Sequence, residues 1–314
     1  MQIIQAPRAS AVLHSLLVKR SDARPWLLPA NICPIVPVTF LKARVPFEFI
    51  DLSATSLQMN PDRTESLARK GAYAGLLYAH TYGEPATPQD LFTAVKQAAP
   101  DMFIIDDRCL CIPDLEPFPT VADVVLYSTG YSKVAELNFG GFAYVQDDVD
   151  YQPAHLQFDE PWLRSLERDY KEAVQKRARF AYMDRDWLDT ESPLPAWSEY
   201  RKRITVSLEA SLETRDKLNK IYAAGLPAEV QLGGEFQTWR FNIRVPNQSR
   251  ILEAIFAAGL FASTHYASLA GIMADGCAPV AEGLASEVVN LFNDHHFTPE
   301  MAESISGIIR ENLL

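Results

Sequence analysis

Two acidic side chains end a segment that has the composition of a buried strand. Ile104 and Ile105 are followed directly by Asp106 and Asp107. Ligands of open α/β sheets bind at the carboxyl ends of strands, so an aspartate here is well placed to meet a cofactor. Side chains alternate along a strand, and we therefore expect the two carboxylates to point to opposite faces. A simple turn cap is the other interpretation of either residue.

A second group of reactive side chains follows the next predicted strand. The segment from Ser128 to Lys133 supplies hydroxyl groups and a glycine that could cradle a phosphate, and a lysine that could form an imine with an aldehyde. Lysine amines become nucleophilic when they are desolvated or lie near another cation. Gly140 and Gly141 then open a further strand, where a close backbone approach is useful.

Each of these residues alone has a simple structural interpretation, but their combination favours the chemistry of a cofactor that forms an imine with lysine. An enzyme that uses pyridoxal 5'-phosphate (PLP) needs a lysine, a carboxylate on the pyridine nitrogen, phosphate donors and a group packed on the ring. Asp107, Ser128 and Lys133 could supply the first three. These residues could therefore form part of a PLP site between two neighbouring strand ends.

The elements that would position these residues alternate along the first 150 residues. Short apolar segments alternating with helix-length ones are typical of an α/β fold with a mainly parallel sheet sandwiched by helices. The nearly continuous apolar character of the strands indicates burial on both faces. Strands are expected at 27–28, 47–50, 74–78, 102–105, 121–127 and 141–145, and helices at 9–18, 61–70 and 88–98.

The second half of the chain has a different pattern. Thr298 as N-cap and Pro299 at the first helical position mark the start of a last helix. The pattern indicates a smaller α+β domain, and we expect a large domain over 1–195 and a small one over 196–314. Helices are expected at 160–190, 197–224 and 249–258, and strands at 239–245 and 287–292.

Composition excludes several classes of protein. The 314 residues carry a formal net charge of −11, which argues against a nucleic-acid partner. No run approaches the roughly 18 apolar residues of a membrane span, and no signal peptide is expected at the start. The four cysteines suggest reduced thiols in the cytoplasm.

The histidines do not predict a metal site. His295 and His296 are adjacent in a loop before the last helix, and neighbouring side chains are expected to diverge. The remaining histidines lack the spacing of metal ligands. We therefore expect no bound metal.

Several segments, in order along the chain, resemble motifs of the DegT/DnrJ/StrS-type sugar aminotransferases. That family has the aspartate aminotransferase fold, so the resemblance implies a PLP fold type I large domain followed by a smaller C-terminal domain. The similar segments are Leu-Pro-Ala-Asn at 28–31, His-Thr-Tyr-Gly-Glu-Pro at 80–85, Ile-Asp-Asp-Arg-Cys at 105–109, Ser-Thr-Gly-Tyr-Ser-Lys at 128–133, Gly-Gly at 140–141 and His-Tyr at 265–266.

The resemblance implies a role for each residue on these motifs. Lys133 would hold PLP covalently and, once freed, act as acid and base in the proton shift. Asp107 would keep the ring nitrogen protonated. Cys109 would pack behind the ring, and Cys33 or Ile32 would replace the stacking aromatic residue of the family.

The phosphate would be bound by two segments that are distant in sequence. Ser128 would contribute its hydroxyl, and Arg8, Ala9 and Ser10 would contribute backbone amides and the positive end of the first helix. The chain departs from the family by having Pro7 and no glycine in this loop. It also has Leu110 where the family usually has a polar residue near the cofactor hydroxyl.

The resemblance thus implies a PLP-dependent aminotransferase that forms a homodimer. The expected substrate is a small molecule, a keto sugar attached to a nucleotide, with an amino acid such as glutamate as donor. Two alternatives stay open: pyridoxal chemistry on another ketone or amino acid, and a non-catalytic relative that keeps the fold for binding or assembly.

Overall fold

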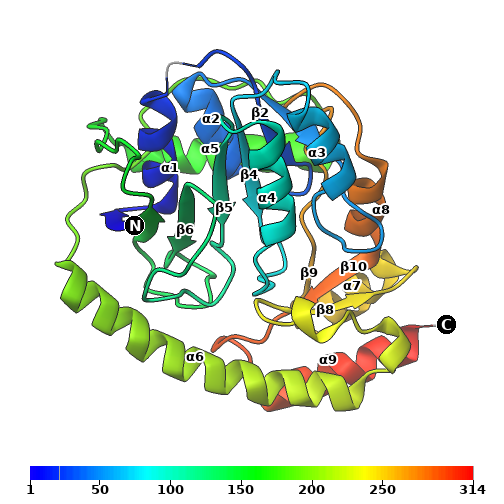
Figure 1. Ribbon diagram of the computed structural model, residues 1–314. Coiled ribbons are helices and arrows are strands. Elements are labelled where there is room, and N and C mark those ends of the chain that lie inside the picture. Colours follow the sequence, from blue (N-terminus) through cyan, green and yellow to red (C-terminus); the bar gives the residue numbers. More distant parts are fainter. Residues whose placement is uncertain (21, 314) are drawn as a thin grey trace.

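A seven-stranded sheet forms the centre of the computed structural model, which describes residues 1–20 and 22–313 (Figure 1). The strand order is β1-β7-β6-β5-β4-β2-β3. Strands β6, β5, β4, β2 and β3 are parallel, whereas β7 runs antiparallel to both β6 and β1. The predicted α/β fold with a mainly parallel sheet is thereby confirmed. The bounds are β1 (Gln2–Ala6), β2 (Trp26–Pro29), β3 (Phe47–Ile50), β4 (Gly75–Ala79), β5 (Phe103–Asp107), β6 (Val124–Ser128) and β7 (Gly141–Val145).

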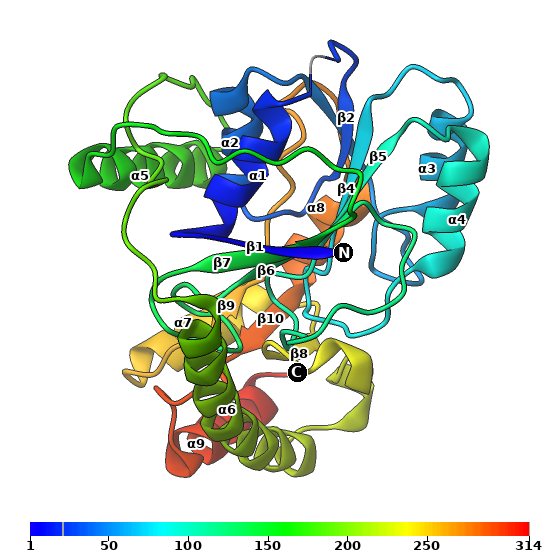
Figure 2. The same cartoon turned by 60° about the vertical axis from the view of Figure 1, so that its left-hand side comes forward.

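Helices cover both faces of this sheet (Figure 2). On one face lie α1 (Ala9–Val18), α2 (Ile35–Ala43) and α5 (Glu160–Lys176); on the other lie α3 (Pro61–Ala68) and α4 (Gln89–Ala98). Successive residues of a strand point to opposite faces and pack in two different cores. Leu28 and Ile105 pack with α1, α2 and α5, and Leu27 and Ile104 pack with α3 and α4. Because side chains on both faces of the strands are buried, the strand sequences are continuously apolar.

A three-stranded antiparallel sheet in the order β8-β10-β9 organises the C-terminal part. Thr298 caps α9 as predicted, because its side chain accepts a hydrogen bond from the amide of Met301 at 3.3 Å. The predicted division between residues 195 and 196 stays a prediction. The bounds are α6 (Trp197–Gly225), β8 (Phe241–Arg244), α7 (Gln248–Ala257), β9 (Ser263–Thr264), α8 (Pro279–Glu287), β10 (Val288–Leu291) and α9 (Pro299–Asn312), with 3-10 turns at Ala228–Val230 and Gly234–Phe236.

The long helix α6 connects the two sheets. Its first half packs Tyr200 and Ile204 against side chains of β6 and β7. Its second half places Leu218 and Tyr222 in the core of the C-terminal part, and it runs beside α9 (Figure 1). Within residues 1–20 and 22–313, no helix combines the length and the apolar character needed to cross a membrane.

Some sequence expectations about the elements were wrong. The helix expected over 160–190 ends at Lys176, because Arg177 adopts a left-handed backbone with φ of 48°. Strand β1 and helices α2 and α8 were not expected. Helix α2 has a continuous apolar sequence without helical periodicity, and it contains Pro37, which is tolerated because it lies in the first turn, where amides need no partner.

Gly141, the first residue of β7, brings the start of α1 directly onto the sheet. A Cβ atom at this position would overlap the backbone nitrogen and Cα of Ala9. Only a glycine therefore allows this contact, and the contact fixes where the first turn of α1 points.

We predict that Gly141→Ala displaces the start of α1 and lowers the free energy of unfolding by about 1–3 kcal/mol, the usual cost of overpacking. Denaturant unfolding of the purified chain measures the change. Gly283→Ala is the matched control, because a Cβ at this position in α8 meets open space. Equal stability of Gly141→Ala and wild type would show that the contact is not tight.

Candidate functional site

A cavity of about 430 Å³ lies at the carboxyl ends of β4, β5 and β6. This is where ligands of α/β sheets bind, and the volume lies within the range of small-molecule sites. The structure brings all of the predicted site residues to its wall. They are Arg8, Ala9, Ser10, Cys33, Asp107, Cys109, Ser128 and Lys133.

Asp107 is the last residue of β5 and is only 6% exposed. One carboxylate oxygen, Oδ1, accepts a hydrogen bond from the amide of Cys109 at 3.0 Å. Burial raises the pKa of Asp107, although the amide of Cys109 and the charges of Lys133 and His80 act in the opposite direction. Among the described residues, Asp107 has no ion pair. The cavity therefore contains a buried carboxylate that a cationic ligand group would stabilise.

Asp106 belongs to a different environment, as the alternation of strand side chains predicts. Its Oδ1 lies 2.7 Å from Nε2 of His80, whose Nδ1 lies 3.2 Å from Oε1 of Glu84. Burial lowers the pKa of His80, but the two carboxylates outweigh it and raise that pKa to about 10. His80 is therefore an imidazolium at neutral pH, and its amide also donates to the carbonyl of Asp107 at 3.0 Å.

Ser128 is the last residue of β6, and Lys133 lies in the loop that follows. The Oγ of Ser128 accepts a hydrogen bond from the amide of Gly130 at 3.3 Å. Ser132 fixes the loop on the other side, because its amide donates to Oε2 of Glu136 at 3.0 Å and its carbonyl accepts from Nε1 of Trp239 at 2.8 Å. Lys133 itself is half-buried. Its positive charge lowers the pKa of Asp107, and both side chains line the cavity.

The first turn of α1 closes one end of the cavity. Ala9 and Ser10 line it, and no side chain caps the helix at Arg8. The first amides of a helix lack partners within the helix and form a site for anions. Arg8 is exposed and also lines the cavity, so its guanidinium adds positive charge at this end.

The remaining wall is apolar or weakly polar. Burial raises the pKa of Cys109 well above its usual value, so the thiol is neutral and packs as an apolar group. Leu110 also lines the cavity, as does Tyr266, whose ring stacks on that of Trp239 with centroids 5.9 Å apart. Cys33 lies half-buried on the same wall.

Sequence reasoning missed one wall of the cavity. Leu163, Glu167 and Tyr170 reach it from α5. Their spacing of four and three residues puts them on one face of a helix. The sequence therefore predicted that the three side chains point in the same direction. It gave no indication of which part of the fold α5 packs against.

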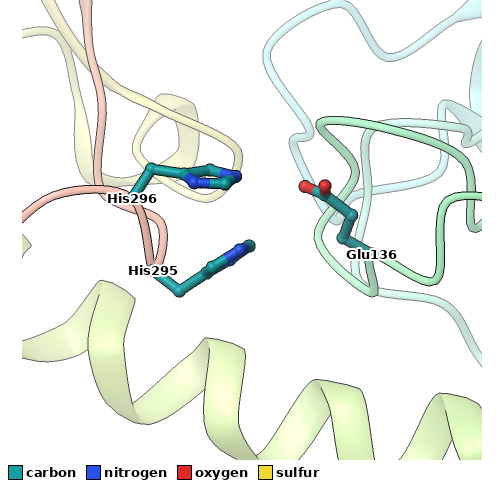
Figure 3. A group of neighbouring side chains, drawn as sticks. All are labelled: Glu136, His295 and His296. Carbon is teal, nitrogen blue, oxygen red and sulfur yellow. The ribbon is translucent and has the colours of Figure 1, made fainter.

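The adjacent histidines also differ from expectation. The imidazoles of His295 and His296 do not diverge; their centroids lie 3.9 Å apart. Both face Glu136, and the three side chains together offer ligand atoms within 4.8 Å of one another (Figure 3). The expectation of divergence was wrong because it applies to extended backbone, whereas these residues lie in a turn in which the amide of Phe297 donates to the carbonyl of Asp294.

We predict that Asp107→Asn stabilises the ligand-free protein at neutral pH. Because burial raises the pKa of Asp107, folding with the carboxyl ionised costs about 1.4 kcal/mol for every tenfold gain in its proton affinity. The cost is fully present above the folded-state pKa and disappears below the unfolded one, so the advantage of the variant shrinks as pH falls.

Unfolding free energies of wild type and Asp107→Asn between pH 4 and pH 8 measure this difference. Asp106→Asn is the control of opposite sign, because it removes a partner of the charged His80 and lowers stability. An Asp107→Asn variant that is less stable than wild type at pH 8 would contradict the account.

No family model matches the chain, and no curated protein matches its sequence. Solved structures do match over its length. A DegT DnrJ EryC1 StrS aminotransferase from Brucella abortus is 16% identical with a TM-score of 0.70, covering 100% of this chain and 86% of that one. Spr1654 from Streptococcus pneumoniae, described as a sugar aminotransferase in its PMP form, is 14% identical with a TM-score of 0.72, covering 100% and 89%.

A third similar structure is that of DesI in the presence of its TDP-sugar product. It is 14% identical with a TM-score of 0.73, and the match covers 99% of this chain and 80% of that one. These identities are low, but the coverage is nearly complete. The chain therefore has the fold of the DegT/DnrJ/EryC1/StrS-type sugar aminotransferases.

Proposed function

We propose that the protein is a PLP-dependent aminotransferase. The observation that carries the proposal is the convergence of Asp107, Lys133, Ser128 and the start of α1 on one cavity. These are the carboxylate, the amine and the phosphate donors that such an enzyme requires. The shared fold with sugar aminotransferases supports the same assignment.

The residues present fit the cofactor. The buried carboxylate of Asp107, which lacks an ion pair among the described residues, suits a protonated ring nitrogen. The uncapped first turn of α1 and the hydroxyl of Ser128 suit a phosphate. The neutral thiol of Cys109 and the side chain of Leu110 offer apolar packing for the ring.

When bound, PLP supplies an electrophilic carbon and a ring that accepts electrons. With the cofactor bound, Lys133 would supply the amine that holds it and would move a proton to or from the substrate. The hydrogen bonds of the Ser132 amide and carbonyl fix the backbone of the residue that precedes Lys133. Asp107 keeps a proton on the ring nitrogen, because a carboxylate favours a nearby positive charge.

The substrate class within this proposal is a keto sugar attached to a nucleotide, with an amino acid such as glutamate as donor. Similarity to DesI, whose structure was determined with a TDP-sugar product, supports a nucleotide-linked sugar. The exposed guanidinium of Arg8 at the wall suits an anionic ligand. Leu110, an apolar residue at the wall, favours the alternative of a different ketone or a non-catalytic role.

The proposal includes a cytoplasmic homodimer. All four cysteines are unpaired, which fits a reducing compartment. Tyr131, at the mouth of the cavity, is 73% exposed in the single chain, and Trp162 and Val206 are other exposed apolar side chains on α5 and α6. A second copy that covered such groups would bury apolar surface.

We predict that the purified chain, incubated with PLP, becomes yellow and that borohydride fixes the cofactor on Lys133. Absorption spectra and peptide mass mapping measure the band and the attachment site. Lys133→Ala removes both, since no other lysine lines the cavity within residues 1–20 and 22–313.

Lys70→Ala is the matched control, because this exposed lysine is not part of the cavity wall and its loss leaves the band unchanged. A colourless wild-type protein, or attachment at a different lysine, would overturn the assignment of Lys133. If the band is present and maps to Lys133, conversion of the bound cofactor by glutamate supports transamination over a binding role.

A further inference from the structure

A second group of potential ligands lies outside the cavity. Glu136 follows Lys133 in the loop between β6 and β7, and His295 and His296 lie between β10 and α9. Figure 3 shows the carboxylate and the two imidazoles projecting toward one another from these two segments. Their ligand atoms lie within 4.8 Å of one another. The proposed transamination uses none of the three.

The turn that carries the histidines is held rigidly. The amide of His296 donates to Oδ1 of Asp294 at 3.1 Å, and Oδ2 of Asp294 lies 2.9 Å from Nη1 of Arg240. Asp294 and Arg240 are both buried, so the turn is anchored to the core. The anchor fixes the backbone from which the two imidazoles project. It also pairs Arg240 with Asp294; burial lowers the pKa of Arg240, and the negative charge of Glu136 acts in the opposite direction.

A hydrogen bond to one of its two carboxylate oxygens orients the side chain of Glu136. Its Oε2 accepts the amide of Ser132 at 3.0 Å, which leaves Oε1 available to a ligand. A cavity of about 260 Å³ is lined by Glu136 and His296 and by Tyr131, which also lines the cavity of the proposed cofactor site. There is room beside the group for a water molecule, which needs about 30 Å³.

We infer that Glu136, His295 and His296 form a binding site for a divalent transition-metal ion of the zinc class. Two imidazoles and one carboxylate are a common ligand set for zinc, with water in the fourth position. Tetrahedral ligand atoms at zinc distances lie about 3.3 Å apart, so the side chains have to close by at most about 1.5 Å. Both histidines are exposed, which allows that movement.

Such an ion would join two parts of the chain that are far apart in sequence. It would bind the loop that carries Lys133 to the segment leading into α9, through Glu136 on one side and the histidines on the other. Because Ser132 donates to Glu136, the ion would brace the residue that precedes Lys133. The metal site itself does not depend on the proposed function.

Binding of ZnCl₂ to the full chain tests the inference. A Cys277→Ser background removes the exposed thiol that could bind zinc independently. Competition with a chromophoric chelator is expected to give one site per chain, and zinc is expected to raise the melting temperature. Glu136→Gln, His295→Gln and His296→Gln are each expected to weaken binding by at least about tenfold and to abolish the thermal shift.

His155→Gln is the matched control. His155 lies 2.8 Å from Glu191 in an exposed histidine–carboxylate pair that lacks a third ligand among the described residues, so its loss is expected to leave zinc affinity unchanged. Circular dichroism verifies that each variant is folded. Cobalt substitution gives a second measurement, because nitrogen and oxygen ligands produce visible bands without a thiolate charge-transfer band. Equal zinc affinity of wild type and the three variants, or a thiolate band, would overturn the inference.

Discussion

The buried carboxylate of Asp107 is the constraint on which the rest of the site depends. Removing a carboxylate from water is costly unless it is paired, and Asp107 has no ion pair within the part of the chain that is described. The structure supports it with one amide, that of Cys109, and with the imidazolium of His80 nearby. A site built in this way is prepared for a ligand that brings its own positive charge.

The layer behind Asp107 explains how the fold tolerates this group. His80 lies between Asp106 and Glu84, and the guanidinium of Arg108 lies 3.7 Å from Asp106. These opposite charges offset one another around Asp106, which does not line the cavity. The positive charge of His80 lowers the pKa of Asp107, although no hydrogen bond joins their side chains among the described residues.

Two close backbone contacts hold the other parts of the site against Asp107. Gly141 lets the start of α1 rest on β7, where Ala9 and Ser10 line the cavity. Gly140, with φ of 88°, lets the hydroxyl of Tyr200 approach its backbone. Helix α6 therefore packs beside the residue that precedes β7. The geometry of the end of the cavity that α1 closes therefore depends on two glycines that bear no functional group.

Much of this could be predicted from local sequence, and some could not. Asp107, Ser128 and Lys133 each end or follow an apolar strand, and the order of neighbouring parallel strands brings such residues together. Glu167 and Tyr170 reach the cavity only because of how α5 packs, which no local pattern contains. The proximity of His295 and His296 to Glu136 was missed because a turn, unlike a strand, can place neighbouring side chains on the same side.

The protonation of the cofactor nitrogen tests the central claim most directly. Nitrogen-15 NMR of the full chain with PLP labelled at the ring nitrogen reports whether that atom carries a proton. The account predicts a protonated nitrogen in wild type over the neutral range and loss of that proton in Asp107→Asn, with Asp106→Asn still protonated. An unprotonated nitrogen in the wild-type complex, or the same signal in wild type and Asp107→Asn, would contradict it.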